Sequence, residues 1–285
     1  MTITASDGRG AIRPLPAPTG CTTTIRRSSQ LAAVMHAAGP GNRICIVGDL
    51  SNERLVVENS GIESARIEIV GDGRTTVRGI TVEANNILIS GINAVRPRAP
   101  RISLVGNNII LINSTSISPR GGDGDGIRFW GNQITISHDT VRDTLNLYGA
   151  HADCMQTFAT DEDRPTSTHV RITHNRCEGI ANTCLIAEGP FTSDGIHHGK
   201  SEDFLFSDNF CENHASEATE IDGIQDVTIA HNQLTGQKDM AFSFQDMATG
   251  GHVTDNTIAP EIDHEVGMDN SSKAGYRGPE ARGGP

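Results

Sequence analysis

The sequence predicts an all-β fold, a single right-handed parallel β-helix closed at its N-terminal end by one α-helix. Short alternating segments recur, and the interval is 22 residues from Asn86 to Asn108 and 25 from Asn108 to Gln133. That period suits one solenoid coil of three short strands. The inward positions hold Ile and Val, without the Leu framework of a leucine-rich repeat. With 31 Gly in 285 residues and only 36% hydrophobic residues, the composition fits a narrow interior between tight turns.

The N-terminal part of the chain is expected to cap the solenoid, because the first coil would otherwise expose its interior. Residues 1–20 are rich in Gly, Pro and polar residues and predict a flexible segment. The segment Ser28 to Ala38 places its apolar residues on one face and predicts an amphipathic helix, with Ser28 or Ser29 as N-cap. The sequence Gly39-Pro40-Gly41 ends this helix.

The coils are expected to form one β-helix domain over residues 21–265, followed by a C-terminal tail over residues 266–285. A shared ending follows several strands, at His174-Asn175, Asp208-Asn209, His231-Asn232 and Asp255-Asn256. Asn at a repeated turn position tolerates a left-handed backbone and can bond to the next coil. The repeated Asn therefore predicts stacked turns.

The charge balance excludes one class of partner. The chain carries 23 Lys+Arg and 35 Asp+Glu, a formal net charge of −12. A nucleic-acid binder needs a basic stripe, so we expect no nucleic-acid partner. No apolar run approaches the roughly 18 residues of a membrane span, and residues 1–20 lack the apolar stretch of a signal peptide. We therefore expect no membrane span.

The six Cys residues form three matched pairs when the coils are aligned. The pairs expected from this alignment are Cys154–Cys184, Cys177–Cys211 and Cys21–Cys45. Neighbouring coils lie about 4.8 Å apart, close to the Cα separation that a disulfide accepts. A ladder of reduced, buried thiols is the alternative, and the absence of Cys-x-x-Cys spacing argues against a metal site. Three disulfides would indicate an exported protein whose signal peptide is absent from this chain.

One outward face of the central coils collects polar and aromatic side chains. Aligning the strands places Asp125 to Trp130 beside Asp153 to Phe158, followed by Thr183 to Glu188 and then Ala218 to Asp222. Strand alternation then sends one set of side chains outward: Arg128, Trp130, Gln156, Glu188, Glu220 and Asp222. Four further residues are expected at the edge of this face: Asp123, Asp125, His151 and Asp153.

Two intervals exceed the basic period beside this face. They are 36 residues from Gln133 to His169 and 34 from Asn175 to Asn209, and the excess falls at Thr160 to Thr168 and at Gly189 to Ser201. Long loops on a rigid scaffold often carry binding function, so these two can wall a groove. Decoration of a solvated face is the alternative.

The helix, the entry Pro40 to Cys45, the turn Val70-Gly71-Asp72-Gly73 and the Asn-Ile coils together resemble the pectate-lyase-like right-handed β-helix superfamily of carbohydrate-active proteins. The resemblance covers residues 21–265 and implies this fold. Lyases, hydrolases, epimerases and non-catalytic proteins share that scaffold. The segment His151 to Gln156 resembles the His-x-Asp-x-x-Gln element that recurs in such proteins. The Asn-Thr-Asp and Gly-His-Gly signatures of polygalacturonase-type hydrolases are absent from this sequence.

Hydrolysis of a glycosidic bond is the leading prediction. It needs one carboxylic acid to protonate the leaving oxygen and a second carboxylate to activate water or attack the sugar. Asp153, Glu188 and Asp222 on adjacent coils supply such pairs, since neighbouring strands lie about 5 Å apart and alternate strands about 10 Å. This chemistry needs no cofactor.

A polysaccharide lyase is the alternative prediction, and a non-catalytic glycan-binding β-helix is the third. β-Elimination needs a base, for which the candidates are Arg128, His151 and Lys200, and a cation to neutralise the uronate carboxylate. Asp123 and Asp125, in an Asp-Gly-Asp-Gly turn, are candidate Ca²⁺ ligands, with an ordinary tight turn as the alternative.

Several further residues are expected to contact a polysaccharide or oligosaccharide substrate. Trp130 and Tyr148 are candidate stacking platforms for sugar rings. Polar contacts are expected from Gln156, Glu220 and Lys200. Asp194 with His197-His198 is a weaker candidate metal site, since adjacent His residues are common in surface loops.

Overall fold

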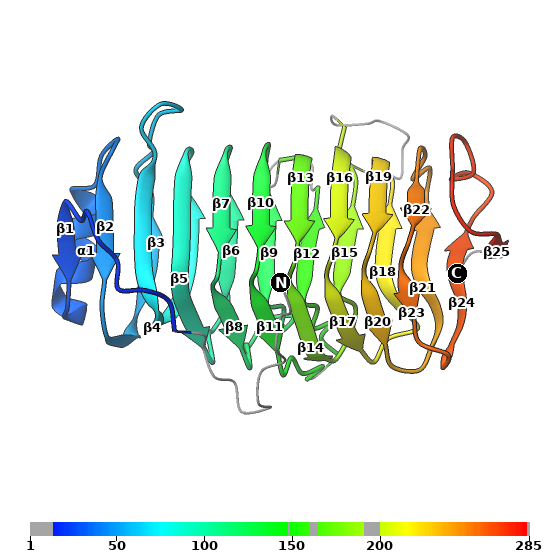
Figure 1. The fold of residues 1–285 in the computed structure, drawn as a ribbon, viewed down its shortest axis with the longest axis horizontal. Coiled ribbons are helices and arrows are strands. Elements are labelled where there is room, and N and C mark those ends of the chain that lie inside the picture. The colour runs from blue at the N-terminus through cyan, green and yellow to red at the C-terminus, as the bar shows by residue number, and fades with distance from the viewer. Residues whose placement is uncertain (1–13, 148, 160–164, 191–199, 284–285) are drawn as a thin grey trace.

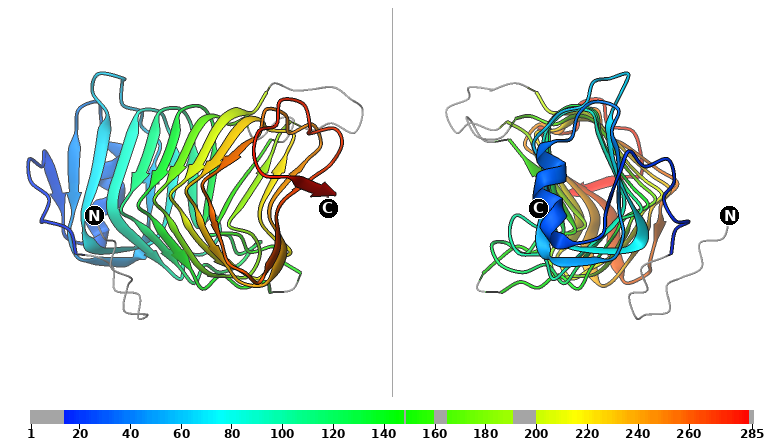
Figure 2. Two further views of the ribbon diagram at one scale, coloured as in Figure 1. Left: turned by 45° about the vertical axis from the view of Figure 1, so that its right-hand side comes forward. Right: turned by 90° about the vertical axis from the view of Figure 1, so that its left-hand side faces the viewer.

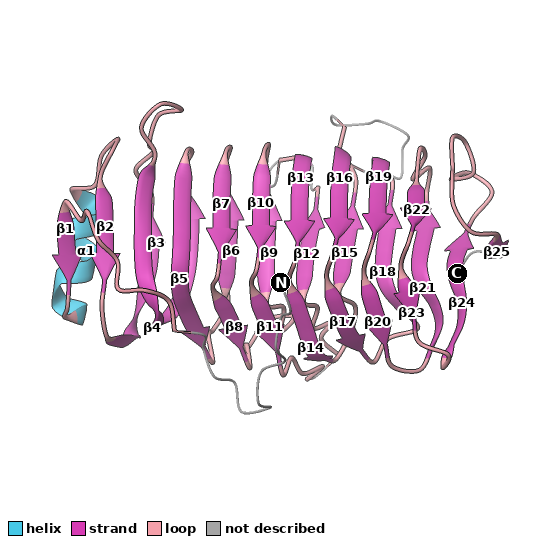
Figure 3. Ribbon diagram, viewed as in Figure 1, coloured by secondary structure: helices cyan, strands magenta, loops and turns pink. Residues whose placement is uncertain are grey.

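The chain forms a parallel β-helix in a computed structural model that describes residues 14–147, 149–159, 165–190 and 200–283 (Figure 1). Each strand pairs in parallel with its equivalents in the coils before and after it. The coils follow one another along the long axis of the molecule, and three sheets run along its sides (Figure 3). The predicted fold class is confirmed.

The first sheet begins at the N-terminal end and contains the early parts of two long, bent strands. Its strands are β1 (Thr23–Ile25), β2 (Arg43–Ile46), the start of β4 (Ile67–Glu83), the start of β5 (Ile87–Val95), β7 (Ile109–Ile112), β10 (Ile134–Ser137), β13 (Thr168–Thr173), β16 (Glu202–Ser207), β19 (Gln225–Ala230) and β22 (His252–Thr254).

The second sheet follows the first around a corner of each coil. It contains the start of β3 (Asp49–Val57), the middle of β4, the end of β5, β8 (Thr115–Ile117), β11 (Thr140–Arg142), β14 (Arg176–Ile180), β17 (Phe210–Asn213), β20 (Gln233–Thr235) and β23 (Thr257–Ile258).

The third sheet carries the face predicted to hold the site. It contains the ends of β3 and β4, then β6 (Ile102–Val105), β9 (Ile127–Trp130), β12 (Met155–Phe158), β15 (Leu185–Glu188), β18 (Glu217–Asp222), β21 (Lys238–Gln245), β24 (Ile262–Met268) and β25 (Ala281–Gly283). The register is as predicted: Met155 pairs with Ile127 and with Leu185, and Glu188 pairs with Asp222.

The core is a set of stacked β-branched, aliphatic and aromatic side chains inside the coils. One row of the first sheet consists of Ile89, Leu111, Ile136, Ile172, Phe206 and Ile229, all buried. Stacking places like residues above one another, so one side-chain type can continue through many coils. The interior is narrow and filled, which explains the modest apolar content of the sequence.

The repeated turns use two adjacent residues with different tasks. The left-handed backbone is adopted by the residue before each repeated Asn, with φ of 58° at His174, 57° at Asp208 and 59° at His231. The Asn that follows bonds to the neighbouring coil, as the Oδ1 of Asn209 accepts from the backbone N–H of Asn175 at 2.9 Å. The predicted bond between coils is present, whereas the left-handed conformation lies one residue earlier, at a position that Asp and His also tolerate.

The predicted cap helix is α1 (Ser28–His36), which lies at the N-terminal end of the solenoid (Figure 2). It buries Leu31 and Met35 against the first coil. The N-cap is Arg27 and not Ser28 or Ser29, and the Gln30 side chain accepts from the backbone N–H of Arg27. No helix within the described residues is long and apolar enough to cross a membrane.

The solenoid continues beyond residue 265. The strand β24 ends at Met268, and β25 pairs with it in parallel through Val266 and Ala281. Residues 266–283 therefore form a further coil rather than a tail. At the other end, residues 14–20 follow the outside of the coils, and the backbone N–H of Leu15 donates to the carbonyl of Asp72.

Three disulfides are present, and two of them differ from the predicted pairs. Cys21–Cys45 is confirmed, whereas the other two are Cys154–Cys177 and Cys184–Cys211. In-register residues such as Cys177 and Cys211 point in the same direction. Their Cβ atoms then lie about as far apart as the strands, which exceeds the roughly 3.8 Å of a disulfide. The observed bonds instead join successive coils around the corner between the second and third sheets.

Candidate active site

The outward face of the third sheet changes character along the solenoid axis. One outward row runs through Ser103, Arg128, Gln156, Ile186, Glu220 and Ser243. A second row, two residues further along each strand, runs through Val105, Trp130, Phe158, Glu188, Asp222 and Gln245. The outward positions of the early coils thus hold a cation and aromatic residues, and those of the later coils hold carboxylates and an amide.

Three carboxyl groups gather on β15 and β18, and we call Glu188, Glu220 and Asp222 the acidic cluster. All three side chains are half-buried. Burial, and then the negative charge of Glu220, raise the pKa of Asp222 to about 7. Burial also raises the pKa of Glu188 and of Glu220, and nearby acidic groups add to the effect at Glu220. Asp222 can therefore hold a proton near neutral pH.

The acidic cluster contains an acceptor without a partner. Oδ1 of Asp222 is buried and has no hydrogen-bond partner among the described residues, and the same holds for Oε1 of Gln156. Gln245 donates from Nε2 to Oε1 of Glu220 at 3.1 Å. Partly desolvated polar groups of this kind with raised pKa values are typical of functional sites.

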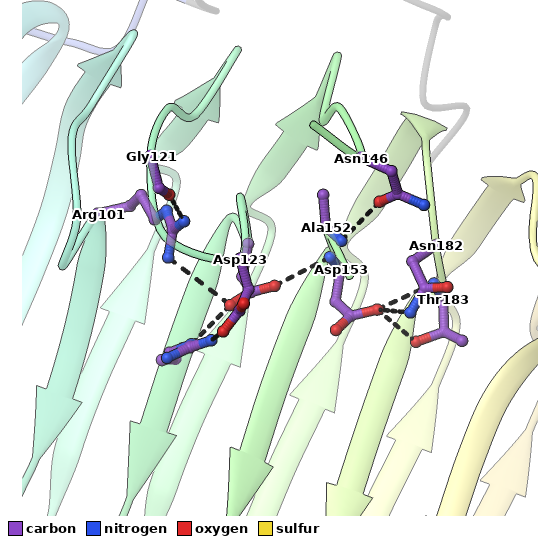
Figure 4. A network of polar contacts seen from close by, with 10 residues as sticks. Arg101, Gly121, Asp123, Asn146, Ala152, Asp153, Asn182 and Thr183 are labelled. Carbon is purple, nitrogen blue, oxygen red and sulfur yellow. Dashed lines mark hydrogen bonds and ion pairs between the residues drawn. The ribbon is translucent and has the colours of Figure 1, made fainter. Parts of the chain in front are cut away.

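An arginine–aspartate network lies beside the cluster at the start of β9 (Figure 4). Arg128 donates to Asp125 at 2.5 Å and to Asp123 at 2.6 Å. The buried Arg101 lies 3.7 Å from the same carboxylate of Asp125 and donates to the carbonyl of Gly121. These bonds fix the turn that leads into β9.

Asp153 is enclosed rather than placed on the outward face. Its side chain is fully buried, and Oδ1 accepts from the backbone N–H of Thr183 at 3.0 Å, from Oγ1 of Thr183 and from Nδ2 of Asn182 (Figure 4). Burial, with the nearby charge of Asp125, raises its pKa to about 7. The carboxyl thus joins β12 to β15 from inside, and a polymer on the sheet does not reach it.

Trp130 is also covered, with a side chain 2% exposed. Its Nε1 donates to the carbonyl of Phe158 at 2.6 Å, and the Phe158 ring packs edge-on against the indole with centroids 5.1 Å apart. Phe158 is the half-buried ring of this pair and lies beside Glu188. Phe158, and not Trp130, is therefore the candidate residue for stacking against a sugar ring.

The three predicted bases differ in availability. Burial acts to lower the pKa of Arg128, but the carboxylates of Asp125 and Asp123 together outweigh it and raise this pKa. A bond to Glu202 raises the pKa of Lys200, which is exposed. His151 is exposed on the segment before β12, and its positive form would favour ionisation of Glu220. Of the three, His151 is the candidate base that binds no carboxylate among the described residues.

The Asp123–Asp125 turn does not fit a Ca²⁺ site. Both carboxylates accept bonds from Arg128, so their oxygens already face a cation. Among the described residues, no group of three or more His, Cys, Asp or Glu side chains is arranged to hold a metal ion. The expected role of this turn as a cation site is therefore replaced by its role in orienting Arg128.

Some predicted residues lie outside the described part of the chain. These are Tyr148, Asp194, His197 and His198. The two expected groove loops are described only in part, since residues 160–164 and 191–199 are outside the described ranges.

Two residues of this face, Phe158 and Gln245, are not among the site residues predicted from the sequence. Phe158 occupies the same outward row as Trp130, so the register itself contained the signal. Gln245 pairs with Asp222 one coil further, beyond the segments that were aligned. Arg101 carried no signal, because its contact with Asp125 depends on the turn between β8 and β9.

The architecture is that of the parallel β-helix proteins that include polysaccharide lyases. The chain is similar in structure to the family PL6 alginate lyase AlyGC, with a TM-score of 0.62 and 14% identity over 87% of this chain and 41% of that one. It is also similar to the PL6 polysaccharide lyase Pedsa3628 from Pseudopedobacter saltans, with a TM-score of 0.58 and 11% identity over 82% of this chain and 63% of that one.

Pectate lyase Pel9A shows the same architecture, with a TM-score of 0.53 and 10% identity over 93% of this chain and 80% of that one. No family model matches the chain, and no curated protein sequence matches it. Identities of 10 to 14% establish the shared fold alone. The chain spans 41% of the length of AlyGC and 63% of the length of Pedsa3628.

Proposed function

We propose that the protein cleaves glycosidic bonds of a uronate-containing polysaccharide by β-elimination at the acidic cluster of Glu188, Glu220 and Asp222. The observation that carries this proposal is the cluster itself. Three carboxyl groups share one outward face, and the pKa of Asp222 is raised to about 7. The three solved lyases with the same fold support elimination over the hydrolysis that the residue inventory first favoured.

The cluster and His151 supply the groups that elimination needs. A base removes the proton from the carbon next to the uronate carboxyl group. The bond from the neighbouring carbon to the glycosidic oxygen breaks, a carbon–carbon double bond forms, and the leaving oxygen takes a proton. We assign the first step to His151 and the last to Asp222, which holds a proton below about pH 7.

The remaining members of the cluster, Glu188 and Glu220, reduce the unfavourable free energy of placing a uronate carboxylate beside the cluster. Burial raises the pKa of Glu188 and of Glu220 and so favours their neutral forms. A neutral carboxyl group can donate a hydrogen bond to the uronate carboxylate, whose charge must be offset as the adjacent proton leaves. Phe158, between Trp130 and Glu188, offers an apolar surface to a sugar ring.

Hydrolysis is a second candidate, favoured by one observation. Glu188 and Asp222 are register partners on neighbouring strands, with raised pKa values, so one can act as acid and the other as base or nucleophile. Asp153, which the sequence placed in this role, is enclosed.

We also propose that the protein works outside the cytoplasm. Three disulfides join successive coils, and such bonds persist in oxidising compartments. A polysaccharide substrate is in keeping with that location.

The test is incubation of the full chain with polymannuronate, polyguluronate, polygalacturonate and a neutral glucan. Ultraviolet absorbance of unsaturated products and release of reducing ends are recorded together. Absorbance with the uronates supports elimination, whereas new ends without absorbance support hydrolysis. Binding without either signal would instead favour a non-catalytic glycan-binding protein.

Two variants locate the activity. Asp222→Asn removes the proposed acid at nearly constant shape and is expected to abolish product formation. Glu212→Gln changes an exposed carboxylate on β17, in the second sheet, and serves as the matched control. Full activity in the Asp222 variant would remove the acidic cluster from the mechanism.

A further inference from the structure

Four arginines gather at the corner where the second sheet passes into the third, in four successive coils. Arg54 on β3 pairs with Gly79, the residue after Arg78. Arg98 and Arg120 lie opposite each other in an isolated parallel bridge. Nη2 of Arg54 donates to the carbonyl of Arg98 at 2.5 Å, which joins the two pairs. We call Arg54, Arg78, Arg98 and Arg120 the arginine patch.

Within the described ranges, the arginine patch has no ion-pair partner. No member has a carboxylate within 4.0 Å in the described part of the chain, and this includes Glu53 beside Arg54. Burial and then the nearby charge of Arg78 lower the pKa of Arg54. Six arginines outside the patch do have an ion pair: Arg43, Arg101, Arg128, Arg142, Arg171 and Arg176. In a protein of net charge −12, this corner is a local positive field.

The members of the patch have different tasks. The guanidinium of Arg54 donates to backbone carbonyls, including that of Pro100, and so holds the turn that carries Arg98. Arg78 and Arg98 are exposed. Arg120 lines a cavity of about 410 Å³, whose other lining residues come from the same turn, 119–124, and from Leu145, Leu147, Gly149 and Ala150. The exposed guanidinium groups can therefore meet a ligand.

The spacing of the patch indicates a linear ligand. Its members follow the strand spacing of about 4.8 Å over four coils. From β9, the strand after Arg120, to β15 are two further strand spacings, or about 10 Å along the solenoid axis, and Glu188 is the last residue of β15. A guanidinium group matches a carboxylate through paired N–H donors. A chain with a carboxylate on successive units would meet these charges in order.

We propose that the arginine patch binds the carboxylates of an anionic polysaccharide, and that the bound chain continues along the third sheet to the acidic cluster. The identity of the ligand rests on the proposed function. The arginines then attract the anionic polysaccharide, which the acidic cluster does not. They hold the chain while the unit that is cleaved lies beside the carboxyl groups of the cluster.

The test measures binding, which does not depend on cleavage. Fluorescence anisotropy of labelled oligogalacturonate and oligomannuronate is recorded at low and high salt, with heparin, a DNA duplex and a neutral dextrin as competitors. Arg98→Gln with Arg120→Gln is expected to weaken binding roughly tenfold at low salt, and less at high salt because exposed charges are screened. Arg98→Lys with Arg120→Lys keeps the charge and retains part of the affinity. Arg277→Gln, an exposed arginine near the C-terminal end, is the control.

The outcomes separate this proposal from the previous one. Weaker uronate binding by the double Gln variant supports the patch, whether or not the wild type forms product. Absence of product from the wild type would reject only the proposed function. Unchanged affinity with intact cleavage would reject the patch and leave the function standing. Heparin or DNA competing better than the uronates, through the same two arginines, would overturn the assignment to carboxylated glycans.

Discussion

Replacement of the enclosed Asp153 by Asn is expected to stabilise the protein at neutral and alkaline pH. The pKa of Asp153 is about 7 in the folded chain, against an ordinary value of 3.8. A pKa raised on folding gives stability that is complete below the unfolded value and is lost as the pH rises through the folded value. At about 1.4 kcal/mol for each unit of pKa, the wild type loses up to about 4 kcal/mol between about pH 4 and pH 7.

The Asn side chain copies the protonated acid. Its Oδ1 can accept the same bonds from Thr183 and Asn182, and it carries no charge at any pH. Guanidinium unfolding at about pH 4 and about pH 8 measures the effect, with Asp239→Asn at an exposed position as control. Equal midpoints at the lower pH and a higher midpoint for the Asp153 variant at the upper pH are expected. A variant no more stable than the wild type at about pH 8 would refute the reasoning.

Three further predictions concern the coils and the site. Cys154→Ala with Cys177→Ala opens a loop with a sequence separation of 23 residues, and loop entropy predicts a loss of about 3 kcal/mol in urea unfolding; an unchanged midpoint would contradict it. Asp139 is buried, with Oδ2 unpartnered, at the ladder position that Asn occupies in later coils. Since burial raises its pKa, Asp139→Asn should raise the thermal midpoint at neutral pH, and a lower midpoint would count against this assignment. The reaction rate should fall as the pH rises through about 7, where Asp222 loses its proton, while a flat profile would exclude Asp222 as the acid. Glu212→Gln should keep the wild-type profile.

Most of the fold could be predicted because the solenoid repeats its pattern. The alternation of Ile and polar residues indicates the faces, and alignment of the short strands across the two longer intervals gives the register of Met155 with Leu185 and of Glu188 with Asp222. The last coil escaped prediction because residues 266–283 contain few apolar residues. They follow the solenoid through backbone bonds, as between Arg277 and Gly251.

The candidate site could be predicted only in part. Periodicity says which side chains point outward, and the outward orientation of Glu188, Glu220 and Asp222 follows from it, whereas their role in a site stays a prediction. It does not say which outward side chains are covered, so it does not predict that Trp130, packed edge-on against Phe158, is buried. Residues in turns escape the alternation altogether. For this reason the burial of Asp153 needed three-dimensional contacts that the sequence does not encode locally.

The most direct test of the account is product formation from the uronate polymers by the wild type, Asp222→Asn and Glu212→Gln, followed by ultraviolet absorbance. The account predicts unsaturated products from the wild type and from the control, and none from the Asp222 variant. Equal product formation by all three proteins, or none from any polymer, would contradict the assignment of polysaccharide cleavage to the acidic cluster.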